Sequence, residues 1–134
     1  MKSTARWVQN YQSVVDNGRN HAVVTDLPKG KNGEDMGATA LELAVMGLSG
    51  CISTIFVLVA GKMHLELSGL VVELEAEQPD GASTITTVNA VVRVRSDADR
   101  NKLEKCLEKT LKTCPVGVLY EQAGITIEHT LVVE

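Results

Sequence analysis

The sequence predicts a single α+β domain, and three observations lead to this fold class. A chain of 134 residues with 44% apolar and 22% charged residues has the size and composition of one globular domain. Hydrophobic periodicities of two and of 3.6 residues occupy separate segments, which indicates both strands and helices. These segments follow the order β-β-α-β-β-α-α-β, which lacks the regular βαβ alternation of parallel α/β folds. We therefore expect one α+β domain spanning residues 1–134.

Composition and charge exclude two classes of function. The formal net charge is -4, and aromatic residues make up only 3% of the chain. Proteins that bind nucleic acids or anionic membranes need a basic surface, and those that bind single strands often add aromatic stacking platforms. We therefore expect neither nucleic acid nor membrane among the partners.

The cysteine count bears on the cellular compartment. The chain has three cysteines, an odd number that fits no closed disulfide framework. The N-terminal stretch MKSTARWVQNYQ contains no apolar run of signal-peptide length. Both observations indicate a reducing compartment, so we expect a cytoplasmic protein whose thiols stay free unless they bind metal or react.

The first 38 residues predict a β-hairpin followed by a loop. Residues that favour β-structure fill Ala5–Val15 and His21–Asp26, and the turn-forming residues Asp16–Gly18 separate the two runs. Glycine, proline and polar residues then dominate Leu27–Ala38, which indicates a loop.

A long apolar helix is predicted to begin at Thr39. Thr39 and Glu42 have the spacing of a capping box, in which each side chain bonds to the backbone N–H of the other residue. The 18 residues from Leu43 to Ala60 carry no charge, a length at the lower limit for spanning a bilayer. Because the run contains many small and hydroxyl-bearing residues and amphipathic strands follow it, we favour a helix buried in protein. One small chain offers too little cover for such a helix, so we expect it at a subunit interface.

The next segment predicts an antiparallel hairpin with one buried face. Apolar and acidic residues alternate over residues 72–77, Gln78–Gly81 form a turn, and apolar and polar residues alternate again over residues 87–95. The glutamates and arginines on the outer face are expected to pair across the two strands. The residues expected to face the core on the return strand are Val88, Ala90, Val92 and Val94.

Two helices and a final strand complete the predicted order. Ser96 or Asp97 is expected to cap a helix whose apolar residues recur at three- and four-residue steps. Pro115 is expected to stop that helix and start another, which places Cys114 at the N-terminus of a short third helix. Alternating apolar residues over residues 125–133 predict the last strand.

The three cysteines differ in the chemistry that their positions favour. Cys51 lies deep in an apolar helix, where burial disfavours a thiolate, so it would be inert without a nearby cation. Cys114 is expected at a helix N-terminus, where backbone N–H groups favour a thiolate. Cys106 is on the apolar face of the second predicted helix, and packing is sufficient to explain it. For Cys51 and Cys114, packing is an equally good explanation on these grounds.

The residues around these cysteines resemble one protein family. The segment Leu41–Cys51, followed by Cys114-Pro115-Val116 and then Ala123-Gly124-Ile125, resembles the OsmC/Ohr family, the osmotically inducible and organic hydroperoxide resistance proteins. The resemblance runs through nearly the whole chain in order and length. It implies an intertwined homodimer of α+β subunits, with the long cysteine helix of each subunit buried at the dimer centre and two active sites at the interface.

The resemblance also implies a thiol peroxidase mechanism. By position, Cys51 looks like the peroxidatic thiol, whose thiolate attacks a peroxide oxygen and becomes a sulfenic acid. Cys114 looks like the resolving thiol, which condenses with that sulfenic acid to a disulfide that an external dithiol reduces. The implied substrate is an organic hydroperoxide, the implied role is oxidative stress defence, and no cofactor or metal is implied.

Three further residues are candidates for activating Cys51. The family uses an arginine from the early strand region, held by a glutamate near the start of the cysteine helix, and Arg19 and Glu42 are the candidates here. In hydroperoxide reductases that glutamate stands ten residues before the cysteine in an Asn-Pro-Glu context, whereas Glu42 stands nine before Cys51 without the proline. His21 is a second candidate for the cation, because strand alternation would place it on the same side as Arg19. Its Asn-His-Ala context resembles the less characterised OsmC-like branches of the family.

Two other functions compete with the peroxidase. If Cys51 does not ionise, we expect a catalytically weak OsmC-like dimer whose interface pocket binds a hydrophobic or acyl ligand. A metal site formed by Cys51, Cys114 and His21 is disfavoured, because no closely spaced pair of Cys or His residues anchors it.

Overall fold

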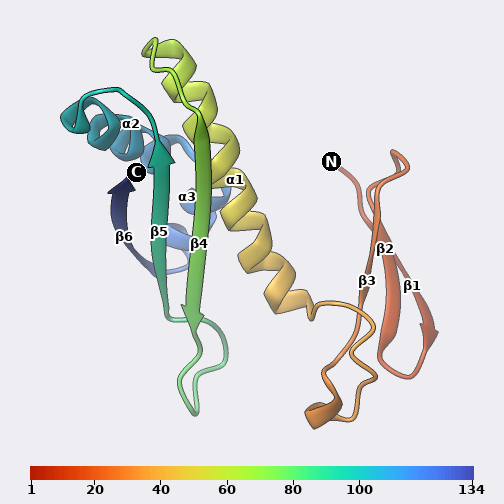
Figure 1. Ribbon diagram of the computed structural model, residues 1–134. Coiled ribbons are helices and arrows are strands. Elements are labelled where there is room, and N and C mark those ends of the chain that lie inside the picture. Colours follow the sequence, from red (N-terminus) through yellow and green to blue (C-terminus); the bar gives the residue numbers. More distant parts are fainter. The chain divides into compact units, whose positions relative to one another are not determined.

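The structure, a computed structural model, describes residues 1–134 and divides into two compact units. The first unit comprises residues 1–44 and the second residues 45–134. Figure 1 shows the elements in chain order, with one sheet in each unit and three α-helices. The combination of two sheets with three helices confirms the predicted α+β class.

A three-stranded antiparallel sheet forms the first unit. Its strands, in the spatial order β1-β2-β3, are β1 (Thr4–Gln9), β2 (Gln12–Asp16) and β3 (Ala22–Thr25). The predicted hairpin that turns after Asp16 is confirmed as the β2–β3 connection. The prediction of one strand over residues 5–15 is wrong, because Asn10 takes a positive φ of 45° and the chain reverses there. Asparagine tolerates this left-handed conformation, and the Trp7 indole N–H donates to the Asn10 carbonyl at 2.8 Å.

Residues 27–38 form the predicted loop, and Asp26 organises it. The only helical turn in this loop is the 3-10 helix η1 (Lys29–Lys31). The buried Asp26 carboxylate accepts hydrogen bonds from the backbone N–H groups of Leu27 (2.7 Å), Glu34 (3.2 Å) and Met36 (3.1 Å). Burial alone would raise the pKa of Asp26, but these donors outweigh it and hold the pKa below its ordinary value. The loop is thus built around one ionised carboxylate.

Helix α1 (Ala40–Lys62) begins where the capping box predicts. The Thr39 N–H donates to the Glu42 carboxylate at 2.7 Å, and the Glu42 N–H donates to the Thr39 hydroxyl at 3.2 Å. By length and composition α1 could cross a membrane. One of its faces packs instead into the core of the second unit, through side chains at four-residue steps: Leu48, Ile52, Phe56 and Ala60.

The other face of α1 is not covered within the chain. Met46, Val57 and Leu58 are each more than half exposed. Gly47, Gly50 and Gly61 add open positions on the helix, with nothing within 4 Å of where a Cβ would lie. Burial on all sides is therefore not reached in a single chain.

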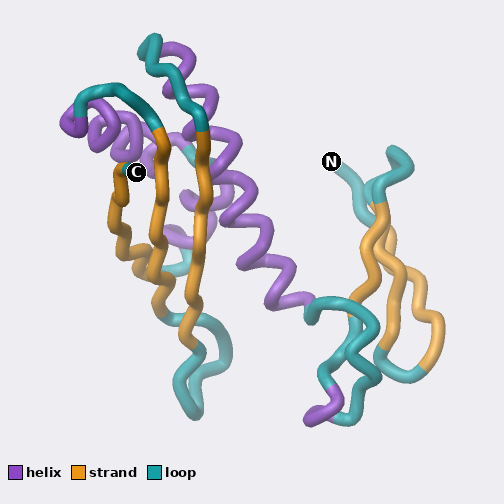
Figure 2. The backbone as a smooth tube through the Cα atoms, viewed as in Figure 1, coloured by secondary structure: helices purple, strands orange, loops and turns teal.

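The second unit contains a mixed three-stranded sheet (Figure 2). In the spatial order β4-β5-β6, its strands are β4 (Gly69–Glu77), β5 (Thr87–Arg95) and β6 (Thr126–Val133). The predicted antiparallel hairpin is confirmed as β4 and β5, whereas β6 joins β5 in parallel. The predicted core positions on β5 are buried, and Arg93 donates to Glu73 at 2.9 Å on the outer face, as the alternation predicts.

Two helices, α2 (Arg100–Thr113) and α3 (Pro115–Gln122), connect β5 to β6. The N-cap of α2 is Asp99, whose carboxylate accepts from the Asn101 N–H at 2.9 Å, so the prediction of a cap at Ser96 or Asp97 is wrong. The Ser96 hydroxyl instead donates to the Glu66 carbonyl. The start of α3 at Pro115 is as predicted.

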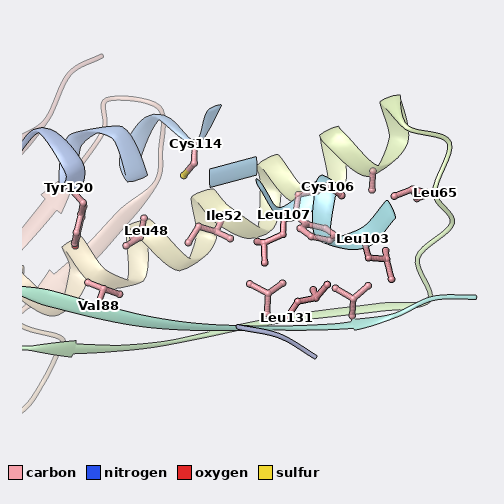
Figure 3. Close-up of a cluster of buried hydrophobic side chains, with 14 of the residues drawn as sticks. Leu48, Ile52, Leu65, Val88, Leu103, Cys106, Leu107, Cys114, Tyr120 and Leu131 are labelled. Carbon is pink, nitrogen blue, oxygen red and sulfur yellow. The ribbon is translucent and has the colours of Figure 1, made fainter. Parts of the chain in front are cut away.

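The core of the second unit lies between these helices and one face of the sheet (Figure 3). Leu48 and Ile52 come from α1, Leu103 and Leu107 from α2, and Val88 from the sheet. Figure 3 also shows the Cys114 side chain pointing from the start of α3 toward α1. The core therefore fixes α1 and the start of α3, and the candidate site lies where these two elements meet.

Candidate thiol site

Two helices bring Cys51 and Cys114 together in the second unit. Cys51 lies near the middle of α1, and its side chain is half-buried. Cys114 is both the C-cap of α2 and the N-cap of α3, and its exposed fraction is 0%. Its place between two helices follows from Pro115, which cannot continue α2 but suits the first turn of α3.

The two sulfur atoms are 2.9 Å apart, with the Cys114 thiol donating to the Cys51 sulfur. Both residues are free thiols. A disulfide has a sulfur–sulfur distance of about 2 Å, so the atoms need to approach by only about 1 Å to bond. The pair is placed so that oxidation can join α1 to the start of α3.

The electrostatic state of Cys114 differs from the sequence-based expectation of a thiolate. Burial, followed by the hydrogen bond with Cys51, raises the pKa of the Cys114 thiol from 9.0 to about 11. The Gly117 N–H, 3.4 Å from the Cys114 sulfur, lowers the pKa but does not outweigh burial. Cys114 is therefore a protonated donor at neutral pH. Such a donor stabilises negative charge on the sulfur it faces, which is that of Cys51.

Gly117 is a site residue that the sequence reasoning missed. A Cβ at this position would lie 3.4 Å from the Cβ of Cys114 and 3.5 Å from its sulfur, so only backbone lies against the thiol here. The signal that could have identified it is its place three residues after Cys114. The N-cap side chain commonly accepts from the backbone N–H of that position.

Cys106 has the structural role expected from its pattern. It is fully buried in α2, and its thiol donates to the Phe56 carbonyl of α1 at 3.7 Å. Burial raises the pKa of Cys106, which keeps the thiol protonated. This hydrogen bond goes to a carbonyl and not to either thiol of the pair.

Arg19 and His21 lie in the exposed turn between β2 and β3. The Asn17 side chain accepts from the Arg19 backbone N–H at 2.9 Å and donates to His21 Nδ1 at 3.1 Å. Between them Asn20 takes a positive φ of 66°, and β3 begins only at Ala22. The strand alternation that placed both side chains on one side is therefore absent. Both residues belong to the first unit, and their approach to the thiols stays a prediction.

Glu42 also belongs to the first unit, and the structure gives it a capping role. The backbone N–H of Thr39, followed by the Thr39 hydroxyl, lowers the pKa of Glu42. Holding Arg19 would be an additional role for this carboxylate, and it too stays a prediction. No group of three or more His, Cys, Asp or Glu side chains is close enough together to hold a metal ion.

Comparison with known families identifies the relationship of this chain. Residues 32–130 match the model of the OsmC-like protein family. The chain belongs to the OsmC-like family. No protein of curated function is detectably similar to it in sequence.

Solved structures of OsmC-like proteins share the fold at low sequence identity. An OsmC-like protein from Mycoplasma pneumoniae is similar with a TM-score of 0.87 at 16% identity, over 98% of this chain and 95% of that one. An organic hydroperoxide resistance protein OsmC from Legionella pneumophila gives 0.73 at 14% identity, over 99% and 98%. An organic hydroperoxide resistance protein from Elizabethkingia anophelis gives 0.72 at 18% identity, over 98% and 93%. These similarities establish the OsmC-like fold.

Proposed function

We propose that this OsmC-like protein is a thiol-dependent peroxidase that reduces organic hydroperoxides in oxidative stress defence. The observation that carries the proposal is the distance of 2.9 Å between the sulfurs of Cys51 and Cys114. Membership of the family, and similarity in fold to proteins named for organic hydroperoxide resistance, support it. We place the protein in the cytoplasm, where reductants can restore its thiols.

The roles of the two thiols follow from their exposure and from the hydrogen bond between them. Cys51 is the more accessible sulfur and accepts a hydrogen bond, so it is the atom that attacks the peroxide. Cys114 is fully buried and stays protonated because its pKa is raised, so it waits as the resolving thiol. A cation from Arg19 or His21, with Glu42 as its partner, would complete the activation of Cys51.

The proposed reaction balances over three steps. The Cys51 thiolate attacks one peroxide oxygen, the O–O bond breaks, the alcohol leaves with a proton, and Cys51 becomes a sulfenic acid. The Cys114 sulfur then attacks the Cys51 sulfur, so that an S–S bond forms, the S–O bond breaks and water leaves. An external dithiol reduces the disulfide by thiol–disulfide exchange and is itself oxidised.

Serine variants test the proposal directly. The reduced protein should consume cumene hydroperoxide in preference to hydrogen peroxide, and Cys51→Ser should remove this activity. Cys114→Ser should complete the first step and accumulate a sulfenic acid that a dimedone probe traps. Cys106→Ser is the matched control and should retain turnover. Full turnover by Cys51→Ser would contradict the proposal.

A second candidate function is a catalytically weak dimer that binds a hydrophobic or acyl ligand. The observation that favours it is that the Cys51 sulfur has only the Cys114 thiol as a hydrogen-bond partner within the second unit. Without a cation from elsewhere, Cys51 would remain a thiol. Thermal stabilisation by fatty acids or acyl thioesters, with no loss of thiol on peroxide treatment, would identify this function.

A further inference from the structure

The start of α3 presents backbone donors to the sulfur of Cys114. Cys114 is the N-cap of α3, and its sulfur accepts a hydrogen bond from the Gly117 N–H at 3.4 Å. The N–H groups of Gly117 and Val116 both lower the pKa of Cys114, although burial outweighs them. They belong to the first turn of a helix, whose unpaired N–H groups carry a partial positive charge. The start of α3 therefore polarises the Cys114 sulfur.

Cys114 connects these backbone donors to Cys51. The Cys114 thiol donates to the Cys51 sulfur at 2.9 Å, and Cys114 is fully buried, so no water competes for its sulfur. Hydrogen bonds that share an atom polarise and strengthen one another. A chain of two hydrogen bonds thus runs from the Gly117 N–H through the Cys114 thiol to the Cys51 sulfur. The three residues all lie in the second unit.

The helix that carries Cys51 cannot supply the same stabilisation. Cys51 lies near the middle of α1, and the electrostatic effect of a helix terminus is confined to its first or last turn. The other buried thiol, that of Cys106, donates to the Phe56 carbonyl and not to Cys51. Within the second unit, the hydrogen bond from Cys114 therefore links Cys51 to the N-terminus of a different helix, α3.

We propose that Cys114 is a catalytic residue of the peroxide step as well as the resolving thiol: its S–H group, polarised by the first turn of α3, stabilises the Cys51 thiolate that attacks the hydroperoxide. The inference rests on the proposed function. It adds a second role for Cys114 and gives the start of α3 a part in both chemical steps.

The proton of Cys114 is kept in the first step and used in the second. The Cys51 thiolate attacks a peroxide oxygen, the O–O bond breaks, and the alkoxide leaves and takes a proton from solvent. The Cys114 sulfur then attacks the Cys51 sulfur, the S–S bond forms and the S–O bond breaks. The proton of Cys114 passes to the departing hydroxide, which leaves as water. The N–H groups of Val116 and Gly117 stabilise the negative charge that develops on the Cys114 sulfur during this attack.

Comparison of serine and alanine at position 114 tests the donor in the first step. Serine keeps a hydroxyl donor and alanine has none. The variants are treated with iodoacetamide at neutral pH, and peptide mapping gives the rate of alkylation at Cys51, which follows its thiolate fraction. We expect Cys114→Ala to react about three- to tenfold more slowly than Cys114→Ser, because hydrogen bonds to ionised groups are strong. The smaller alanine opens space beside Cys51, which would speed alkylation, so a slower rate reports the lost donor.

Two controls separate the lost donor from the loss of a buried thiol. Cys106→Ala truncates the other buried thiol and should alter the alkylation of Cys51 less than about twofold, because Cys106 has no hydrogen bond to it. Cys114→Val fills the space without a donor and should react as slowly as Cys114→Ala. If alkylation of Cys106 shows that Cys114→Ala unfolds, Cys114→Val takes its place in the comparison with Cys114→Ser. Equal rates in the serine variant and the variants without a donor would overturn the inference.

A single turnover with cumene hydroperoxide separates this inference from the proposed function. Dimedone should trap the Cys51 sulfenic acid faster in Cys114→Ser than in Cys114→Ala, by the same factor as the alkylation rates. Sulfenic acid that forms at equal rates in the two variants would overturn the inference and leave the peroxidase intact. Absence of sulfenic acid in both variants, with no peroxide consumption by the wild type, would contradict the proposed function. The alkylation rates need no peroxide, so they test the hydrogen bond in either case.

Discussion

Tyr120 carries a buried hydroxyl group that has no hydrogen-bond partner in the chain. Its ring packs in the core on the α3 side, near Leu48 and Val88 (Figure 3). A buried unpaired polar group costs about 1–3 kcal/mol. We predict that Tyr120→Phe keeps or raises the free energy of unfolding, by up to about 2 kcal/mol, whereas Tyr120→Ala lowers it by about 3–5 kcal/mol. Chemical denaturation measures both, and a clear loss in Tyr120→Phe would show that the hydroxyl is paired in solution.

Titration of Cys114 predicts a loss of stability at alkaline pH. Its pKa is raised from 9.0 in the unfolded chain to about 11 in the fold, chiefly because it is buried. The folded state therefore holds the proton longer, and the stabilisation is complete below about pH 9 and is lost as the pH rises toward about 11. Burial raises the pKa of Cys106 and Tyr120 as well, so these groups act in the same direction.

The measurement is the free energy of unfolding of the reduced protein between pH 8 and 11. The rise in the pKa of Cys114 corresponds to a decrease in the free energy of unfolding on the order of 2 kcal/mol over this range. Cys114→Ser should show a shallower decline over the same range, because serine does not titrate there. An unfolding free energy that increases with pH would contradict the assigned state of Cys114.

Among the elements, the loop over residues 27–38 contains the most crowded glycine of the chain, Gly33. A Cβ on Gly33 would lie 1.8 Å from the Leu27 carbonyl oxygen, a backbone atom that cannot turn away as a side chain does. Gly30, in the η1 turn of the same loop, has nothing within 4 Å of the corresponding position. We predict that Gly33→Ala destabilises the first unit by about 1–3 kcal/mol or more, whereas Gly30→Ala changes stability by less than about 0.5 kcal/mol. Hydrogen exchange of residues 22–38 measures both, and equal protection in the two variants would contradict the prediction.

The elements that the sequence could predict are those specified by local chemistry. The start of α1 follows from the capping box of Thr39 and Glu42, and the break before α3 follows from Pro115. The reversal at Asn10 was missed because asparagine permits a turn without requiring one. The N-cap of α2 was misplaced because Ser96, Asp97 and Asp99 can all act as an N-cap. The Ser96 hydroxyl donates instead to the Glu66 carbonyl.

Features that depend on distant parts of the chain were beyond prediction from local pattern. The alternation of residues 125–133 predicts a strand, but its parallel pairing with β5 depends on where α2 and α3 return the chain. The geometry of the site also depends on distant parts of the chain. The spacing and the family resemblance indicate Cys51 and Cys114 as candidates, but only the packing of α1 against the α2–α3 junction sets the distance between their sulfurs. Gly117 was missed because its role is defined by contact with Cys114.

At the scale of the whole molecule, the uncovered face of α1 predicts a homodimer. Val57 and Leu58 are exposed by 52% and 55%, and the open positions at Gly50 and Gly61 allow another helix to approach closely. A charged side chain on this face would be desolvated in the dimer, so Val57→Lys should shift the protein to monomers in sedimentation experiments. Leu119→Lys is the matched control, since Leu119 is an exposed apolar residue on another helix, and it should leave the dimer unchanged. A wild-type protein that sediments as a stable monomer, or a Val57→Lys protein that remains dimeric, would contradict an interface on α1 and remove the cover that the Cys51 helix requires.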